Sequence, residues 1–345
     1  MSLPLALPIA PMLARSVAEI PRGAYAYEPK WDGFRCIAAR DGDTVTLWSR
    51  SQNPLTPYFP EVVAALARTL PTQIILDGEL VVRSGEPGAE HLDWETLSLR
   101  LHPAERRIAR LATRHPATLI AFDLLALGDV DLTPLPFKTR REALVDVVPT
   151  SGGGTLHRSR TTHDPDVADT WFATFEGAGL DGVVAKEMDA PYRPGARAML
   201  KIKHSRTADT VVIGYSRSRT GHGVGSIHLG LYDELGALIP VGGIGAWPDA
   251  VRSQLEGVLA PLVLTGADAD TAPSPSEVSR AGIRDFVPVQ PDLVVEVAYD
   301  QMQGTHFRSA VGFQRWRPDR DPRSCGLDQI ERPVAYDLGT VWQDG

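Results

Sequence analysis

The segment Glu28-Pro29-Lys30-Trp31-Asp32-Gly33-Phe34-Arg35 joins two short runs of strand character, residues 25–30 and 34–40. Asp-Gly is a typical turn dipeptide, so one strand is predicted to end at Lys30 and the next to begin after Gly33. A lysine attacks an electrophile only after it has lost its proton, which burial and neighbouring positive charge make easier. The segment alone leaves two interpretations open: a nucleophilic lysine that the turn directs into a pocket, or a surface lysine beside a hairpin turn.

Short strands alternate with helical patterns on both sides of this segment, up to about residue 204. Asp41-Gly42-Asp43 is a hairpin signal. Pro60 opens a helical pattern, as proline often does in a first helical turn. The predicted strands are 25–30, 34–40, 44–48, 74–76 with 80–82 (a pair or one bent strand), 119–127, 180–186 and 199–203, and the predicted helices are 60–70, 91–111 and 166–177.

The pattern changes after His204. Five strand-like stretches follow, at 211–215, 227–232, 238–244, 293–299 and 311–317, with one helical stretch at 248–259 between the third and the fourth. This order is typical of a small, partly closed barrel of the oligonucleotide-binding (OB) type. Residues 151–154 and 265–279 are predicted to be loops. We therefore predict an α+β domain over residues 1–205 and an all-β OB-fold domain with a terminal tail over residues 206–345.

Composition excludes several classes of protein. The chain has 345 residues, 35 Lys or Arg against 43 Asp or Glu, and a formal net charge of −8, which excludes a uniformly basic nucleic-acid coat protein. Its two cysteines cannot form a disulfide framework or a four-cysteine zinc site. The apolar N-terminus lacks Lys or Arg before Arg15 and is interrupted by prolines, unlike a secretory signal, and no apolar run reaches the ~18 residues of a membrane span. A cytoplasmic protein without membrane contact is expected.

Further motifs follow the lysine segment. They are Ser49-Arg50, Leu76-Asp77-Gly78-Glu79, Ala121-Phe122-Asp123, Asp181-Gly182-Val183-Val184-Ala185-Lys186, Lys201-Ile202-Lys203 and Arg317-Pro318-Asp319-Arg320. In order and spacing the set resembles the motif series of the covalent nucleotidyltransferases, which comprise ATP-dependent DNA ligases, RNA ligases and mRNA capping enzymes. With residues 295–299 and 313–321, the likeness is strongest to the short two-domain bacterial ATP-dependent DNA ligases. It covers nearly the whole chain and implies a nucleotidyltransferase (adenylation) domain of ATP-grasp-like antiparallel sheets with helices, followed by an OB-fold.

The resemblance implies a role for each motif at the nucleotide. Lys30 attacks the α-phosphate of ATP and holds AMP through a phosphoramidate bond. Glu28 lies at the edge of the adenine and Phe122 stacks on it, while Arg35 and Arg50 contact ribose or phosphate oxygens, to which a guanidinium group is well matched.

The remaining motifs of the first domain imply a metal and a cationic patch. Glu79 and Asp181 are expected near Mg²⁺ (or Mn²⁺), although position 181 is more often Glu in the family, which leaves direct ligation by Asp181 open. Lys201 and Lys203 alternate along a strand and so point to one side, toward the α-phosphate. Lys186 is placed with this pair, and Arg197 is a nucleotide or DNA contact.

Basic residues outside the nucleotide site are expected to contact pyrophosphate or DNA. The resemblance implies that Arg317, Asp319 and Arg320 orient the departing pyrophosphate, with Arg320 standing where the family usually has Lys. Residues 186–219 carry eight Lys or Arg against three acidic residues, and residues 308–323 carry five Arg against two. Such stretches suit sequence-independent phosphate contacts. The predicted DNA contacts are Arg50, Arg193, Arg217 and Arg219, the last two in a loop over residues 217–225.

The expected function is the sealing of nicks in duplex DNA. ATP adenylates Lys30, AMP passes to the 5′-phosphate of the nick, and the 3′-hydroxyl displaces AMP. A monomer is expected that acts in DNA repair or recombination, with repair proteins as possible partners. Within the superfamily, an RNA ligase or a capping guanylyltransferase is the alternative. Outside it, the alternative is a nucleic-acid-binding module with a decayed site, which the presence of Lys30, Glu79, Lys201 and Lys203 argues against.

Overall fold

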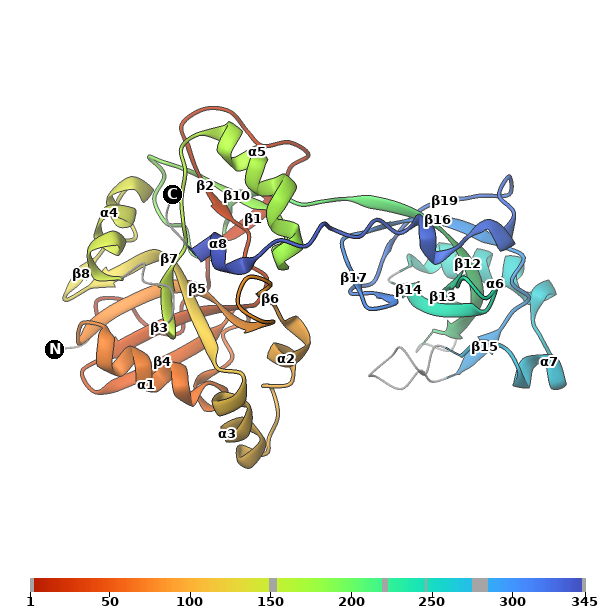
Figure 1. The fold of residues 1–345 in the computed structure, drawn as a ribbon, viewed down its shortest axis with the longest axis horizontal. Helices are drawn as coiled ribbons and strands as arrows, with labels where there is room; N and C mark the ends of the chain where they lie inside the picture. The colour runs from red at the N-terminus through yellow and green to blue at the C-terminus, as the bar shows by residue number, and fades with distance from the viewer. Residues whose placement is uncertain (1–2, 149–153, 219–222, 246, 275–284, 343–345) are drawn as a thin grey trace. The chain divides into compact units, whose positions relative to one another are not determined.

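The structure is a computed structural model that describes residues 3–148, 154–218, 223–245, 247–274 and 285–342 (Figure 1). The chain divides into two compact units: residues up to Lys203 with a terminal segment from Pro333, and His204–Arg332. The predicted division placed residues 333–345 with the second domain. In the structure the terminal segment packs on the first unit, because Leu338, Val341 and Trp342 are buried in its apolar core.

The larger sheet of the first unit has the strand order β4-β3-β5-β7-β8, with β6 beside β5 and β9 beside β7. Its neighbours are antiparallel except β7 and β9. Residues 74–82 belong to one strand, whose register against β7 shifts at Ile75/Leu76 and Asp77/Gly78. The strands are β3 (Phe34–Asp41), β4 (Thr44–Ser49), β5 (Gln73–Ser84), β6 (His91–Leu92), β7 (Ala117–Leu127), β8 (Val130–Asp131) and β9 (Leu156–Arg158).

A smaller sheet has the order β1-β11-β10-β2. Its strands are β1 (Leu13–Ser16), β2 (Tyr25–Pro29), β10 (Val183–Glu187) and β11 (Arg197–Ile202). Apolar side chains of both sheets, among them Ile37 and Ile75 from the larger and Met199 from the smaller, share one core cluster. Because β2 ends at Pro29 and β3 begins at Phe34, residues 30–33 cross from the smaller sheet to the larger one.

The helices and 3-10 turns of the first unit are α1 (Pro60–Thr69), α2 (Trp94–Ser98), α3 (Glu105–Arg114), α4 (Phe137–Val147), α5 (Pro165–Thr174), α8 (Leu338–Trp342), η1 (Thr56–Tyr58) and η2 (Phe175–Ala178). The single helix predicted over 91–111 is wrong. His91 and Leu92 pair with β5, and the side chain of Asp93 caps α2 by accepting a hydrogen bond from Thr96 N at 2.8 Å. In the described part of the chain no helix has both the length and the apolar character needed to cross a bilayer.

The second unit is built on a curled antiparallel sheet of order β14-β13-β12-β16-β19, with β15 beside β12 and a β17-β18 ribbon. Helix α6 follows β14, as predicted, so the arrangement is consistent with the OB-fold. Its elements are β12 (Arg206–Arg217), β13 (Val224–Tyr232), β14 (Leu238–Ile244), α6 (Asp249–Leu259), η3 (Ala260–Leu262), α7 (Ala267–Asp270), β15 (Phe286–Pro288), β16 (Val294–Tyr299), β17 (Met302–Gln303), β18 (His306–Phe307), β19 (Gly312–Trp316), η5 (Pro322–Ser324) and η6 (Leu327–Gln329). Residues 151–153 and 275–279 of the predicted loops lie outside the described residues; α7 forms within the described part of 265–279.

His228 makes the stability of the second unit dependent on pH. Its ring is buried on β13, where Nε2 lies 2.8 Å from Ser216 Oγ, and burial lowers its pKa to about 4. An unfolded histidine titrates near 6.5, so the unfolded chain binds more protons between about pH 6.5 and 4, and stability is lost as the pH falls through that window. Full protonation should cost roughly 3 kcal/mol.

We expect urea titrations between pH 7 and 4.5 to show a loss of unfolding free energy that His228→Gln reduces, because glutamine does not titrate. Equal losses in both proteins would mean that His228 is not the group responsible. The carboxylates are common to both proteins, so the difference between the two curves isolates the histidine.

Candidate active site

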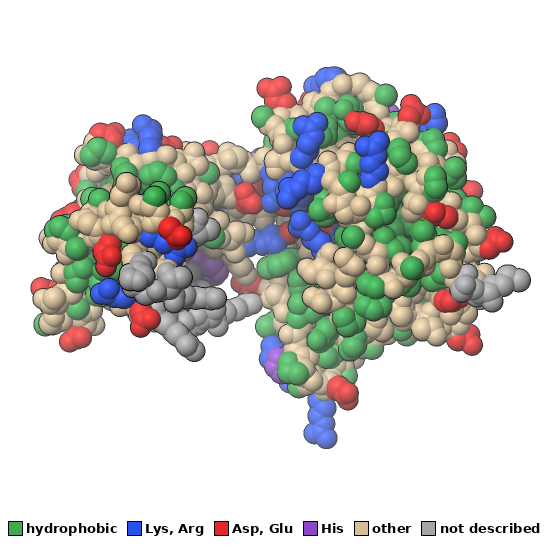
Figure 2. All heavy atoms as spheres, turned by 180° about the vertical axis from the view of Figure 1, so that it is seen from behind, with side chains coloured by type: hydrophobic (Ala, Val, Ile, Leu, Met, Phe, Trp, Pro, Cys, Tyr) green, Lys and Arg blue, Asp and Glu red, His purple; other side chains and the backbone are tan. Residues whose placement is uncertain are grey.

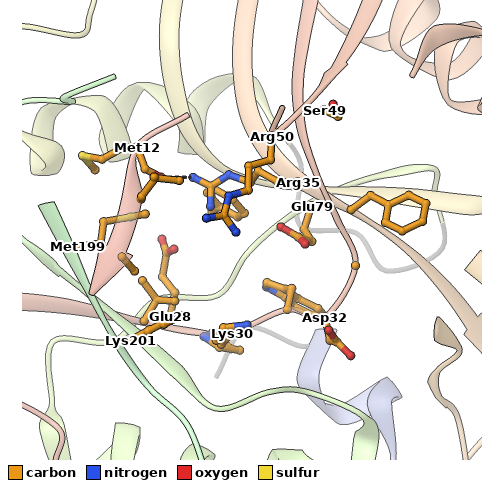
Figure 3. A pocket seen from close by; sticks show the side chains of 18 of the residues that line it. Met12, Glu28, Lys30, Asp32, Arg35, Ser49, Arg50, Glu79, Met199 and Lys201 are labelled. Carbon is orange, nitrogen blue, oxygen red and sulfur yellow. Dashed lines mark hydrogen bonds between the residues drawn. The ribbon is translucent and has the colours of Figure 1, made fainter. Parts of the chain in front are cut away.

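A cavity of about 500 Å³ opens in the first unit (Figure 3). Figure 3 shows Glu28, Lys30 and Lys201 on one side of it and Arg35, Arg50 and Glu79 on the other. All ten residues predicted to bind the nucleotide line this cavity: Glu28, Lys30, Arg35, Arg50, Glu79, Phe122, Lys186, Arg197, Lys201 and Lys203. Residues separated by up to 175 positions are therefore brought to one place.

Two glycines allow the chain to hold Lys30 at the junction of the sheets. A Cβ atom on Gly33 would lie 2.1 Å from the carbonyl oxygen of Leu80, and one on Gly182, where φ is +120°, would lie 2.0 Å from that of Ile202. Any larger residue would push the chain away. Lys30 N donates to Gly182 O at 2.8 Å and Asp181 N donates to Lys30 O at 2.9 Å, so the two Asp-Gly motifs are fastened to each other.

The side chain of Lys30 belongs to a cationic cluster around one carboxylate. Asp181 Oδ2 accepts hydrogen bonds from Lys30 Nζ at 2.5 Å and from Lys203 Nζ at 2.8 Å. Burial works in the opposite direction, but these two ammonium groups hold the pKa of Asp181 below its ordinary value. Burial, Lys203 and Lys30 together lower the pKa of Lys201. The cluster presents excess positive charge to the cavity, as a phosphate would require.

A buried ion pair closes another part of the cavity. Lys186 Nζ lies 2.8 Å from Glu28 Oε2, and both side chains are only 3% exposed. The ammonium group also donates to the carbonyl oxygen of Phe122 at 2.8 Å and lies 4.8 Å from the centre of that ring. Lys186 was predicted to join Lys201 and Lys203; in the structure its ion-pair partner is Glu28.

Arg35 is held by a network that the sequence analysis missed. Its guanidinium group donates to both carboxylate oxygens of Asp77, at 2.6 and 2.7 Å, and lies 4.5 Å from the centre of the Phe122 ring. Tyr192 Oη donates to Asp77 at 2.7 Å and accepts from Met12 N at 2.9 Å. Burial alone would lower the pKa of Arg35, but the carboxylate of Asp77 raises it, so the guanidinium group stays charged. Asp77 stood within a quoted motif, whereas nothing in the sequence pointed to Tyr192.

Glu79 is the carboxylate of the cavity that best fits a metal. Burial raises its pKa to about 7, against the influence of Arg35 and Lys30. In the described residues no three His, Cys, Asp or Glu side chains are grouped closely enough to hold an ion by themselves. Mg²⁺ suits such a site, since it is commonly bound by one or two carboxylates together with substrate phosphates and waters. The carboxylate of Asp181 faces two ammonium groups instead.

Apolar residues complete the lining, among them Trp31, Trp94 and Leu101, none of which the sequence analysis selected. Trp31 Nε1 donates to Ser159 Oγ at 2.9 Å, and its ring stacks on that of Trp342 at 5.1 Å between centres. The terminal segment thus contacts the residue next to Lys30.

The other predicted site residues lie outside the cavity. In the second unit, Arg317 bridges Asp209 at 3.0 Å and Asp319 at 2.9 Å, and Arg320 lies 3.6 Å from Asp209. The hydrogen bond from Arg317 lowers the pKa of Asp319 to about 2. Asp209, which lies close to both arginines, was not selected as a site residue from the sequence, where it is more than 100 residues away from them.

The predicted DNA contacts differ in their settings. Arg50 and Arg197 are exposed at the cavity, and Arg193 is exposed outside it. Arg217 is 55% exposed and 3.7 Å from Glu256. Arg219 lies outside the described residues. Figure 2 shows Lys and Arg side chains gathered over part of the surface of the first unit.

Comparison with known proteins agrees with this geometry. The first unit has the fold of a nucleotidyltransferase domain, and the chain matches a solved structure titled "DNA binding with a minimal scaffold: Structure-function analysis of Lig E DNA ligases" with a TM-score of 0.55 at 17% identity, over 89% of this chain and 99% of that one. This likeness is one of fold. The family model described as ATP dependent DNA ligase domain matches residues 11–203, and that for the ATP dependent DNA ligase C terminal region matches residues 220–320.

Curated relatives match at full length. DNA ligase C of Mycobacterium tuberculosis is 49% identical over 99% of each chain, and DNA ligase C1 of Mycolicibacterium smegmatis is 47% identical over 100% of each. The chain belongs to the ATP-dependent DNA ligase family.

Proposed function

We propose that this chain seals nicks in duplex DNA with ATP, through an AMP adduct on Lys30. The observation that supports this most directly is the position of Lys30 Nζ, at a cavity lined by the predicted nucleotide-binding residues and beside Lys201 and Lys203. The enzyme uses the adduct to divide one difficult phosphoryl transfer into easier steps.

In the first step the unprotonated Nζ of Lys30 attacks the α-phosphorus of ATP. A P–N bond forms, the P–O bond to the β-phosphate breaks, and pyrophosphate leaves. Lys201 and Lys203 stabilise the negative charge on the transferred phosphate. Glu28 contacts the adenine edge and Phe122 stacks on the base, with the Lys186 ion pair holding both in position. Arg35, fixed by Asp77, and Arg50 contact ribose or phosphate oxygens.

Glu79 would hold a divalent metal, Mg²⁺ or Mn²⁺, together with the phosphates of the substrate. The metal, when bound, supplies positive charge to the phosphate oxygens. Asp181 orients Lys30 and Lys203 and reaches a metal only if these contacts open.

The second unit contributes Arg317, Asp319 and Arg320, which orient the departing pyrophosphate. For the later steps, Arg50, Arg193, Arg197 and Arg217 contact DNA phosphates, and Arg219 is proposed with them from the sequence alone. AMP then passes to the 5′-phosphate of the nick, and the 3′-hydroxyl attacks that phosphate and releases AMP.

Substrate choice tests the proposal. Purified chain incubated with α-labelled ATP should gain label, whereas α-labelled GTP should give none. A nicked DNA duplex should be sealed, and a duplex nicked in an RNA strand should not. Labelling by GTP would point to a capping enzyme, and sealing of RNA alone would point to an RNA ligase.

The metal requirement should depend on pH through Glu79. Because its pKa is raised to about 7, Glu79 is a neutral acid below that pH, and its proton must leave before a metal binds. The half-saturating Mg²⁺ concentration for adenylation should rise about tenfold per pH unit below 7 and level off above it.

The carboxamide of Glu79→Gln removes this proton competition, so the variant should need more Mg²⁺ at every pH and show a flat dependence. Identical half-saturating concentrations at pH 6 and 8 in the native protein would contradict the assignment. Comparing concentrations rather than rates separates Glu79 from the titration of the attacking amine.

A further inference from the structure

Helix α3 carries a row of arginines that the nucleotide site does not use. Arg106, Arg110 and Arg114 are exposed and four residues apart, so they form one stripe along the helix. The helix is anchored by Ile108, which is buried. In the portion of the chain that the structure describes, none of the three arginines has an acidic side chain within ion-pair distance.

The repulsion within the stripe is unfavourable for the helix, although Glu105 in the first turn and Arg114 in the last turn suit its dipole. Like charges four residues apart destabilise a helix by a few tenths of a kcal/mol per pair, and the N-terminal Ala104 provides no side-chain cap. A polyanion bound alongside the helix would offset the repulsion among these arginines. Four residues of helix rise about 6 Å, close to the roughly 6.8 Å axial rise of two nucleotides of one DNA strand.

The position of α3 links two hollows of the first unit. Just before the helix, Leu101 is 50% exposed and lines the cavity that holds Lys30. Arg100 fixes this junction, since its buried guanidinium group lies 2.8 Å from Glu61 and donates to Tyr58 O at 2.7 Å. At the other end, Arg114 lines a second hollow of about 210 Å³ together with Arg83, His115 and Glu90, whose carboxylate lies 3.9 Å from Arg83.

The helix is also accessible. In Figure 1 α3 lies at the periphery of the first unit, beyond α2, and the corresponding projecting end in the space-filling view carries Lys or Arg side chains at its surface (Figure 2).

We propose that the stripe of Arg106, Arg110 and Arg114 binds the phosphate backbone of the duplex whose nick lies at the Lys30 cavity. The proposal rests on the proposed function. The stripe contacts phosphates along one strand outside the reacting nucleotide, with Arg83 and Arg114 holding the phosphate farthest from the nick. These contacts are independent of base sequence and act on affinity, not on the chemistry at Lys30.

The test compares two triple variants of the full chain. Arg106→Ala/Arg110→Ala/Arg114→Ala removes the stripe and keeps a residue that favours helix. The control, Arg22→Ala/Arg68→Ala/Lys138→Ala, removes the same charge from exposed positions that line neither hollow. Each adenylated protein is titrated against labelled nicked duplex by fluorescence anisotropy between 50 and 200 mM KCl.

Each phosphate contact contributes about 0.9 to the slope of log K against log salt, so the stripe variant should lose about 2–3 from that slope and bind roughly 10- to 100-fold more weakly. Its adenylation by ATP without DNA should be unchanged, and the control should keep the native slope. An unchanged slope in the stripe variant, or an equal loss in the control, would overturn the proposal. Absence of adenylation or sealing in the native protein would instead reject the proposed function.

Discussion

Lys30→Ala should form no AMP adduct. Alanine has no nitrogen to attack the α-phosphorus, and the neighbouring ammonium groups of Lys201 and Lys203 occupy other positions on the cavity wall. We expect at least about a 10⁴-fold loss of sealing, as for removal of a covalent nucleophile. Intact-protein mass spectrometry after incubation with ATP is the measurement: the native chain should gain the mass of AMP and lose it again with pyrophosphate and magnesium.

A second substrate separates loss of the nucleophile from loss of the fold. Duplex carrying AMP already joined to the 5′-phosphate of the nick needs no adduct on Lys30, so Lys30→Ala should still seal it. The variant should also melt close to the native temperature, because Lys30 is partly exposed and the ion pair between Lys203 and Asp181 remains. AMP bound covalently to Lys30→Ala would falsify the mechanism.

Lys186→Ala should cause a large loss of stability. It leaves the carboxylate of Glu28 buried without its cation and the carbonyl oxygen of Phe122 without its donor. Breaking a buried ion pair by removing one partner typically costs 3–5 kcal/mol. In a unit of this size we expect the melting temperature in calorimetry to fall by roughly 10 °C or more.

The matched control replaces both charges. Glu28→Gln/Lys186→Met keeps the side-chain volumes and leaves no unpaired charge, so it should be more stable than Lys186→Ala although it carries two changes. Labelling with ATP should be weakened in both variants, since both break the ion pair of Glu28, the residue that we propose contacts the base. Equal stability of Lys186→Ala and the native chain would mean that the pair is not buried in solution.

Most of the charged residues around the cavity could be selected from the sequence because they belong to short local motifs. The Asp32-Gly33 turn shows where one strand has ended and the next begins, and the alternation of Lys201 and Lys203 predicts that their side chains point to the same side. The resemblance to nucleotidyltransferases then assigned them to one site. What could not be predicted is how these groups pair, because pairing depends on strand register between distant segments. The contact between Lys186 and Glu28 follows from the antiparallel register of β10 and β2, and no local pattern contains it.

The error at residues 91–111 has a related cause. The prediction of one helix ignored two residues inside the range. Asp93 is a typical helix-capping residue, and Pro103 is a residue that interrupts a helix. Pairing of His91 and Leu92 with β5 then outweighed the local preference. No local pattern pointed to Tyr192 or Asp209. Each is an isolated polar residue in the sequence, and its partner, Asp77 for Tyr192 and Arg317 for Asp209, comes close only in the folded chain.

The terminal segment packs on the first unit, where Trp342 stacks on Trp31. Along the sequence, residues 204–332 are therefore an insertion within the first unit. One proteolytic cut near residue 204 leaves the two pieces held together by the packing of α8. A fragment that stops at Lys203 carries every residue that lines the Lys30 cavity, but it exposes the indole of Trp31, next to Lys30, to water. The part of the chain that holds the complete Lys30 cavity and its packing is therefore discontinuous in sequence, and a fragment designed to keep that packing has to join the residues from Pro333 onward to those up to Lys203.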